Sequence, residues 1–301
     1  MDIVHENLPI SKINPRVIYA QVFHGDEDFE KGEALEARHV RDYELEYFFD
    51  SEGSMYIDGE LYPIRKGDIV FRRPGQSTQG IMPYSCYFIS FDMTNSLPIY
   101  DNWYATCDWE RSEAKFQPYY TNSILDNIPT IFHIRNEDKY YDLFDKVYQT
   151  YLNPIPGSEL PMKSCVLDIL YLLYQDSCNP VNTMQASPYG KTIKKTMDYI
   201  NENIHRKLSL KQLSDIADLS PNYFHKIFTE LMKTTPNDYI ITARLNKAKE
   251  LLLRTNLPAY QIADQCGFNN VSYFSFLFKK SFRLTPIDFR RKHSYVNYGM
   301  N

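Results

Sequence analysis

The pattern that determines the C-terminal fold of this chain occurs twice, as LSDIADLSPNYFHKIF over residues 213–228 and as IADQCGFNNVSYFSFLF over residues 262–278. Each copy reads as a short helix, a tight turn and a longer helix, which is the arrangement of a helix-turn-helix. Matching positions stand 49 or 50 residues apart: Leu213 and Ile262, Tyr223-Phe224 and Tyr273-Phe274, and Phe228 and Phe278. The sequence therefore predicts two helix-turn-helix units in tandem.

Capping signals support this phasing of the helices. Ser209 and Gln212 have the spacing of a capping box at the start of the first short helix. An N-cap residue precedes a proline, which is favoured at the first helical position, at Ser220-Pro221, Thr235-Pro236 and Thr285-Pro286. Residues 236–253 read as one helix of about 27 Å. Because one turn of DNA is about 34 Å long, both units could enter successive major grooves on one face of a duplex.

Positive charge is concentrated in the same part of the chain. The 301 residues carry a formal net charge of −5, which by itself argues against a nucleic-acid partner. Residues 191–301, however, hold 18 Lys and Arg against 9 Asp and Glu, a net of +9. The preceding residues hold 15 basic and 29 acidic side chains, a net of −14. The basic helical segment suits a polyanionic partner.

Residues 193–291 resemble the DNA-binding domain of the AraC/XylS family of transcription regulators. The resemblance rests on four runs: Arg244-Leu245-x-x-Ala248-Lys249-x-Leu251-Leu252, Ile262-Ala263-x-x-Cys266-Gly267-Phe268, Ser272-Tyr273-Phe274-Ser275-x-x-Phe278-Lys279-Lys280-x-Phe282 and Thr285-Pro286-x-x-Phe289-Arg290. It implies a regulator, more often an activator than a repressor, that binds double-stranded DNA in the major groove, with RNA polymerase as a possible partner. The alternative is a metal-independent cupin protein whose basic helical domain binds a protein partner.

Helix geometry indicates which side chains of the longer helices face DNA. An apolar stripe on each helix must face the core, which leaves two outward sets: Asn222, His225, Lys226 and Thr229 in the first unit, and Ser272, Ser275, Phe276 and Lys279 in the second. Asn suits the edge of adenine, and Lys suits guanine or phosphate. Each of these residues can instead be a solvated side chain or a phosphate contact, but the resemblance favours Asn222, His225 and Lys226 as base readers.

One departure from the family concerns base recognition. Phe276 takes the place that Lys226 holds in the first unit, where the family often has Arg or Lys. An outward Phe makes no bidentate hydrogen bond, so it could touch a thymine methyl group or pack against a neighbour. We hypothesise that the second unit contributes less base-specific readout than the first.

Two further departures concern turns. Lys233 and Arg283 stand where the family usually ends these helices with Gly. A left-handed cap would cost a residue with a Cβ atom about 1 kcal/mol, so we expect these ends to be frayed or differently capped. Asp218 replaces the turn glycine that the second unit keeps as Gly267, and Asp tolerates such turns moderately.

The N-terminal part reads as short antiparallel strands over residues 17–92. Aromatic and β-branched runs are punctuated by turn signals, of which Asp58-Gly59 marks the clearest hairpin. After residue 138 the apolar spacing becomes helical and predicts two helices. The expected face of each is Tyr141, Phe144, Val147, Tyr148 and Tyr151, then Val166, Ile169, Leu170, Leu173 and Tyr174.

The predicted fold class is α+β, with an N-terminal cupin-like antiparallel β-barrel and helical hairpin followed by an all-α domain with two helix-turn-helix units. The cupin-like part resembles the family's sensor domain less specifically. The expected divisions are 1–135 for a ligand-binding sensor, 136–178 for the hairpin, 179–190 for a linker and 191–292 for the DNA-binding domain. The apolar face of the hairpin suits dimerisation, as in the family, or packing against the barrel.

The histidines argue against metal chemistry in the barrel. Enzymatic cupins bind a metal through a His-x-His pair and later Glu and His residues, and these are missing, so we expect no metal, no cofactor and no enzymatic activity. The barrel interior could still bind a small molecule such as a sugar. Arg38, Tyr43 and Tyr47 are the candidate ligand contacts, unless the tyrosines only fill the core.

The remaining sequence signals concern the compartment. The five cysteines are scattered, without CxxC pairs, which is typical of reduced thiols in a cytosolic protein. Residues 1–16 lack the apolar region of a signal peptide. The most apolar stretch, Val166 to Tyr174, is short and contains Asp168, so no membrane span is expected.

Overall fold

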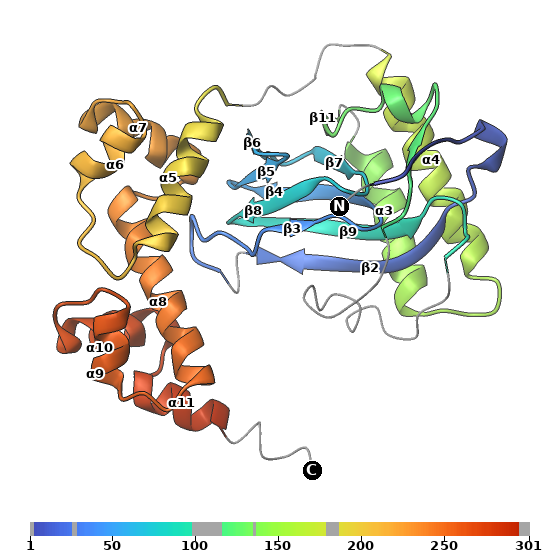
Figure 1. Ribbon diagram of the computed structural model, residues 1–301. Helices are drawn as coiled ribbons and strands as arrows, with labels where there is room; N and C mark the ends of the chain where they lie inside the picture. Colours follow the sequence, from blue (N-terminus) through green and yellow to red (C-terminus); the bar gives the residue numbers. More distant parts are fainter. Residues whose placement is uncertain (1–2, 26–28, 98–115, 135–136, 179–186, 295–301) are drawn as a thin grey trace. The chain divides into compact units, whose positions relative to one another are not determined.

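The computed structural model describes residues 3–25, 29–97, 116–134, 137–178 and 187–294. The chain divides into two compact units, residues 1–190 and 191–301 (Figure 1). The first unit mixes strands and helices, and the described part of the second is helical, so the α+β class is confirmed. Cys107, most of the expected linker (179–186) and the expected boundary at 135–136 lie outside the described residues.

Two antiparallel sheets form the body of the first unit. The five-stranded sheet has the order β11 (Ile131–His133), β7 (Asp68–Arg72), β4 (Tyr43–Ser51), β9 (Tyr84–Asp92) and β2 (Arg16–His24). The four-stranded sheet has the order β3 (Arg38–His39), β8 (Ser77–Ile81), β5 (Ser54–Ile57) and β6 (Glu60–Pro63). A short parallel pair, β1 (His5–Asn7) with β10 (Tyr119–Thr121), lies apart from both.

The expected closed barrel is not formed by the described strands, because no ladder joins the two sheets. The pairing of β4 with β9 shifts register between Phe48 and Asp50, and the chain then turns into β5 of the other sheet. Strands that bend at such bulges make the corners between two packed sheets instead of continuing one ladder. The predicted hairpin is confirmed. Asp58 and Gly59 join β5 to β6 with φ of 51° and 80°, and positive φ at both residues is what a type I′ turn requires.

The side chains of β4 alternate between the two faces of the large sheet. Tyr43, Leu45 and Tyr47 belong to a core shared with the helices, whereas Glu44 and Glu46 are buried on the opposite face. Successive residues of a strand point to opposite faces. Aromatic and acidic side chains therefore alternate along β4. The first six residues are all buried because both faces of the sheet are covered.

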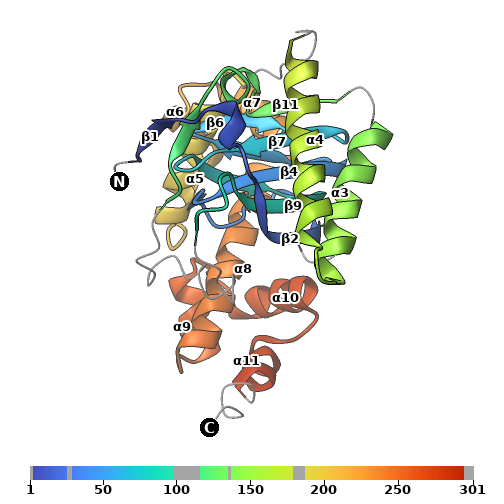
Figure 2. The ribbon, with the colours of Figure 1, turned by 90° about the vertical axis from the view of Figure 1, so that its right-hand side faces the viewer.

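Helices α3 (Glu137–Leu152) and α4 (Glu159–Ser177) lie side by side on one face of the five-stranded sheet (Figure 2). Phe144, Val147, Val166, Ile169 and Leu173 are fully buried in the core between helices and sheet, which confirms the predicted apolar faces in outline. The hairpin thus uses its apolar face for packing within the unit.

The predicted face of α3 is wrong at one position, because Tyr140 is buried and Tyr141 is 44% exposed. Tyr140, Phe144 and Val147 have the i, i+4, i+7 spacing of one helix face, and Tyr141 lies to the side of it.

The second unit consists of seven helices in its described residues: α5 (Gly190–Glu202), α6 (Leu210–Ile216), α7 (Pro221–Met232), α8 (Pro236–Arg254), α9 (Ala259–Gln265), α10 (Val271–Phe282) and α11 (Pro286–Ser294). The pairs α6–α7 and α9–α10 are the two predicted helix-turn-helix units, and α8 connects them.

The predicted caps of these helices are confirmed, except that the Ser220 side chain makes no capping hydrogen bond. Ser209 and Gln212 form a complete capping box. Thr235 and Thr285 each accept a hydrogen bond from a backbone N–H three residues later, at 3.2 Å in both cases.

The helix ends at Lys233 and Arg283 contradict the expectation of fraying. Both residues adopt left-handed caps, with φ of 56° and 60°. Asp218 and Gly267 have φ of 53° and 77° at equivalent turns, which confirms that Asp takes the conformation of the missing glycine. The repeated backbone geometry therefore overrides side-chain preference at three positions that carry a Cβ atom.

We expect Lys233→Gly and Arg283→Gly each to stabilise the helical unit by about 1 kcal/mol, because glycine adopts a left-handed conformation without steric cost. Urea unfolding of the full chain, followed by helical circular dichroism, measures this gain. Lys280→Gly is the control: it lies within α10, so it should lose about 1 kcal/mol. Destabilisation by both cap variants would contradict the assigned backbone conformation.

Candidate functional site

The outer face of α7 presents the polar residues that the sequence singled out. Phe224 and Phe228 are fully buried, and Asn222, His225 and Lys226 are exposed on the other side of the helix. These three side chains are therefore positioned to contact a partner without disturbing the core.

Thr229 does not share this outward position. Its side chain is half-buried, and its hydroxyl oxygen is buried without a hydrogen-bond partner in the part of the chain that the structure describes. Helix periodicity alone places this position outside, and the burial of the hydroxyl oxygen differs from that expectation. We therefore remove Thr229 from the candidate surface.

The corresponding face of α10 has a different character. Ser272 and Lys279 are exposed, whereas Ser275 is half-buried. Phe276 is 64% exposed. Of the two roles expected for it, packing against a neighbour is therefore not observed. The two outer faces share a framework and differ in chemistry, since one is polar and basic and the other has an aromatic ring at its centre.

The spacing of the two faces is set by α8, whose 19 residues span about 28 Å. Arg244 of α8 donates hydrogen bonds to the backbone oxygens of Ile204 (2.9 Å) and Arg206 (2.6 Å). Arg290 of α11 likewise binds the backbone oxygens of Leu252 (3.2 Å) and Leu257 (2.6 Å). Arg244 thus joins α8 to the segment after α5, and Arg290 joins α11 to the last turn of α8 and the segment after it.

These two arginines were recognised in the sequence only as parts of a motif. Their role is to donate hydrogen bonds to backbone oxygens near helix ends, which have no partner within the helix. The spacing of residues in the sequence does not reveal this role. Arg244 and Arg290 thus use several of their donors on the domain's own backbone, and their positive charge is part of the net +9.

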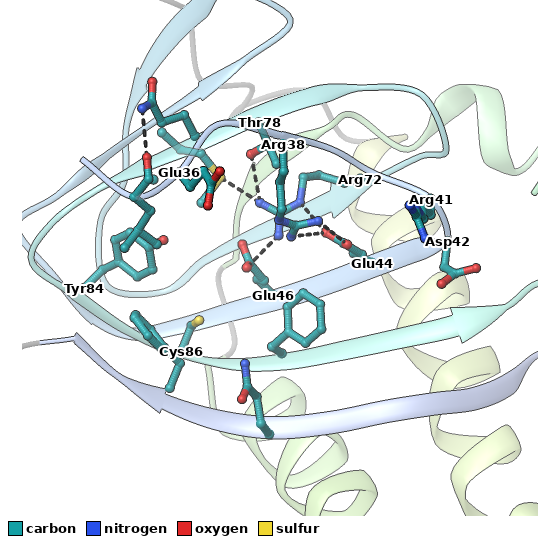
Figure 3. Close-up of a pocket in the computed structure, with 17 residues that line it drawn as sticks. Glu36, Arg38, Arg41, Asp42, Glu44, Glu46, Arg72, Thr78, Tyr84 and Cys86 are labelled. Carbon is teal, nitrogen blue, oxygen red and sulfur yellow. Dashed lines mark hydrogen bonds and ion pairs between the residues drawn. The ribbon is translucent and has the colours of Figure 1, made fainter. Parts of the chain in front are cut away.

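A cavity of about 320 Å³ lies within the first unit, between the two sheets (Figure 3). Strands of the large sheet contribute Glu44, Glu46 and Arg72, and the smaller sheet contributes Met55 and Thr78. Figure 3 shows the two glutamates and Arg72 gathered at the centre of this space. The apolar part of the lining comprises Phe23, Leu35, Met55, Tyr84, Cys86 and Phe88.

The predicted ligand contacts Tyr43 and Tyr47 do not reach this cavity, whereas Arg38 does. Both tyrosines point to the helix-facing core, where Tyr43 Oη donates to the Pro118 oxygen at 3.1 Å and accepts from Tyr120 N–H at 2.7 Å. The sequence analysis chose the aromatic face of the strand, but the intervening residues, Glu44 and Glu46, face the cavity. The alternative that the tyrosines fill the core is the one observed.

A buried ion-pair network occupies one wall of the cavity. Arg72 Nε donates to Glu44 Oε2 at 2.8 Å, and Arg72 Nη2 lies 2.6 Å from Glu46 Oε1. Arg38 binds Glu44 through two hydrogen bonds of 2.6 and 2.8 Å. Burial alone would raise the pKa of Glu44, but the two arginines outweigh it and lower this pKa. The glutamates raise the pKa of Arg72, so the network is charged and balanced.

One acceptor of this network is left without a partner. Glu46 Oε2 is buried and makes no hydrogen bond within the described ranges, whereas Arg72 Nη2 is ion-paired with the other oxygen of Glu46. Glu46 is 6% exposed and Arg72 2% exposed, and both line the cavity. A buried acceptor is costly when unsatisfied. The wall can therefore bind a group that donates a hydrogen bond.

Asp42, another carboxyl group that lines the cavity, has a pKa close to neutral pH. Burial raises the pKa of Asp42 to about 6, opposed by a hydrogen bond from Gln117 and reinforced by the charges of Glu44 and Asp92. Gln117 Nε2 lies 2.7 Å from Asp42 Oδ1. Because this pKa is higher in the folded than in the unfolded chain, stability falls as pH rises from about 4 to 6 and stays lower above that.

We expect Asp42→Asn to stabilise the first unit by about 1–2 kcal/mol at pH 7.5, a figure reduced for solvent screening of a partly exposed group. At pH 4 most of the gain should be lost, because Asp42 is then protonated in the folded chain and partly protonated in the unfolded chain. Thermal unfolding at the two pH values measures the difference. An equal effect at both pH values would contradict the pKa.

The described residues contain no group of three or more His, Cys, Asp and Glu arranged to hold a metal ion. Within the same residues, no helix has the length and apolar character needed to cross a membrane.

Comparison with known proteins adds to this geometry. Residues 213–292 match the family described as a helix-turn-helix domain. The chain is 34% identical to the probable transcriptional regulator LumQ of Photobacterium leiognathi over 30% of this chain and 36% of LumQ, so it spans only about a third of that relative. It is 26% identical to YdiP of Escherichia coli, an uncharacterised HTH-type transcriptional regulator, over 97% of this chain and 91% of YdiP.

Two further comparisons cover different extents of the chain. The lactose operon transcription activator of Staphylococcus xylosus is 20% identical over 82% of each chain. The C-terminal domain of a two-component response regulator from Fusobacterium nucleatum has 37% sequence identity over 32% of this chain and 95% of that domain, with a TM-score of 0.31.

The second unit is thus a helix-turn-helix domain with two units on one connecting helix. Through this domain, the chain is similar to the AraC/XylS type of transcription regulator.

Proposed function

We propose that this protein is a transcription regulator that binds double-stranded DNA by placing α7 and α10 in successive major grooves. The observation that carries the proposal is the repeated outer face, in which side chains opposite a buried Phe pair are exposed on both helices. Asn222, His225 and Lys226 are proposed to read bases in one groove, and α10 with Ser272, Phe276 and Lys279 occupies the next. Half-buried Ser275 is a weaker candidate.

Selection of bound duplexes from a random pool by the full chain tests this function. We expect one sequence with two half-sites to be enriched. Lys226→Ala should then weaken binding to the selected duplex by about 1–3 kcal/mol, and should relax the preference at one base pair, because lysine contacts guanine or phosphate. Lys66→Ala removes an exposed lysine from the first unit and is the matched control. An unenriched pool, or equal effects of the two variants, would contradict the proposal.

We further propose that the cavity between the sheets binds a small, neutral effector with several hydroxyl groups, such as a sugar. The unpartnered Glu46 Oε2 offers an acceptor to a hydroxyl group of the effector. Arg38 and Arg72 are already matched by two glutamates, so a carboxylate or phosphate would add unbalanced negative charge. Neighbouring Phe23, Tyr84 and Phe88 provide the apolar surface that sugar rings pack against.

Calorimetric titration of the full chain with neutral sugars and with the matching sugar acids tests this assignment. Binding of a neutral sugar is expected to weaken at least tenfold in Glu46→Gln, because the amide loses an acceptor and the charge balance of Arg72 changes. Asp50→Asn, on the same strand but outside the cavity, is the control. Tighter binding of the acids would contradict the neutral class.

We also propose that the chain activates transcription in response to a sugar signal, with RNA polymerase as a partner. Activation and the sugar signal are supported by the similarity, over 82% of each chain, to a lactose operon transcription activator. Dimerisation is proposed through the outer side of the hairpin, where Leu152, Leu160 and Tyr171 are more than half exposed. Sedimentation of the full chain tests it: Leu160→Asp and Tyr171→Asp should yield monomers, and unchanged sedimentation would contradict this interface. We also propose that the first unit is related to cupin-like sensors.

A further inference from the structure

The outer face of α10 is centred on an aromatic side chain that contributes little to the packing of its own domain. Phe276 is 64% exposed, and it lies two residues from both Phe274 and Phe278, which are fully buried. Two residues along an α-helix correspond to a rotation of about 200°. The Phe276 ring therefore points away from the core, at the middle of the outer surface.

The repeat gives this position a defined place in the proposed DNA interface. Lys226 lies between Phe224 and Phe228 in the same way, and it is exposed at the centre of the α7 face. Helices α7 and α10 are both 12 residues long and end in the same left-handed cap. If both units enter a major groove in the same orientation, Phe276 faces the base pair of the second half-site that corresponds to the one Lys226 faces in the first.

The surroundings of the ring favour DNA over an apolar protein partner. Ser272 lies one turn before Phe276, and Lys279 and Lys280 follow in the next turn, all of them exposed. Two cations and a hydroxyl group beside the ring suit phosphates and base edges. The apolar group that a major groove offers is the 5-methyl group of thymine.

We propose that Phe276 determines specificity by contacting a thymine 5-methyl group in the second half-site. The two units then read DNA by different chemistry, because the first uses hydrogen bonds and the second an apolar contact. The inference rests on the proposed DNA-binding function, but it assigns a base and an atom that the function alone does not.

Replacement of thymine by uracil tests the contact, because it removes only the methyl group. The full chain first selects a duplex from a random pool. The half-site in which Lys226→Ala relaxes preference is assigned to α7, and the other half-site to α10. Each thymine of the α10 half-site is then replaced by uracil. We expect one replacement in the α10 half-site to weaken binding about fourfold, the value for burying one methyl-sized group. Replacements in the α7 half-site should leave the loss of affinity caused by Lys226→Ala unchanged.

Variants at Phe276 complete the test. Phe276→Ala should bind the thymine duplex about as weakly as the native chain binds the uracil duplex, and should no longer distinguish the two. Phe276→Leu should retain part of the discrimination. Leu253→Ala, at an exposed leucine of α8, is the control and should retain the full uracil effect.

The outcomes separate the inference from the function on which it rests. An unenriched pool would overturn the DNA-binding function itself. An enriched duplex that tolerates every uracil, or a Phe276→Ala chain that still distinguishes uracil from thymine, would overturn the role of Phe276 alone. Circular dichroism melting of each variant checks that the exposed substitutions leave the fold intact.

Discussion

Arg72→Met is expected to destabilise the first unit by about 3–5 kcal/mol, because it removes the cation between two buried carboxylates. Glu44 would keep its two hydrogen bonds to Arg38, but Glu46 would lose its ion-pair partner while 6% exposed. Thermal unfolding at pH 7.5 measures the loss.

The double variant Arg72→Met with Glu46→Leu is the control that separates charge imbalance from other causes of the loss. It removes both charges, and replacement of a buried ion pair by apolar side chains of similar size is often neutral or stabilising. We therefore expect it to recover most of the lost stability while losing sugar binding. If the double variant is less stable than Arg72→Met alone, the charge imbalance is not the cause of the loss.

Gly267→Ala is expected to destabilise the helical unit by about 2–4 kcal/mol, since two costs combine at one position. Gly267 has a left-handed φ of 77°, and a Cβ atom there would collide with the backbone oxygen of Ile204 and the guanidinium group of Arg244. These are the groups that join α8 to the end of the α5 segment. Urea unfolding and affinity for the selected duplex should both show the loss.

Asp218→Ala in the equivalent turn of the first unit is the matched control. Asp218 already carries a Cβ atom at a φ of 53°, so its replacement should cost under about 1 kcal/mol. Similar losses at the two positions would mean that backbone conformation alone, and not the contact with Arg244, makes Gly267 necessary.

The helical unit could be predicted from the sequence because its signals are local. Capping residues and proline positions each act within one or two helical turns, and the helices begin where these signals place them. The 50-residue repeat shows the same signals a second time. The left-handed caps at Lys233 and Arg283 were missed, since local preference opposes them and the packing of the repeated turn imposes them. Helix periodicity also did not show that Thr229 is half-buried.

The cavity was harder to predict because it depends on which face of β4 the helices cover. Period-two alternation separates Tyr43 and Tyr47 from Glu44 and Glu46, but it does not say which set faces a ligand. Large aromatic side chains suggested a binding surface, whereas α3 and α4 cover this face of the sheet and share one apolar core with Tyr43 and Tyr47. Two glutamates at alternate positions of an otherwise buried strand were the signal that could have found the cavity wall.

A hydroxyl-radical footprint of the full chain on its selected duplex tests the central claim most directly. The two units on α8 are predicted to protect two segments about 10 base pairs apart on one face of the helix. This protection should disappear steeply as salt increases, because phosphate contacts release counterions. A single protected segment, protection around the whole duplex, or binding that is insensitive to salt would contradict the account of two units reading successive major grooves.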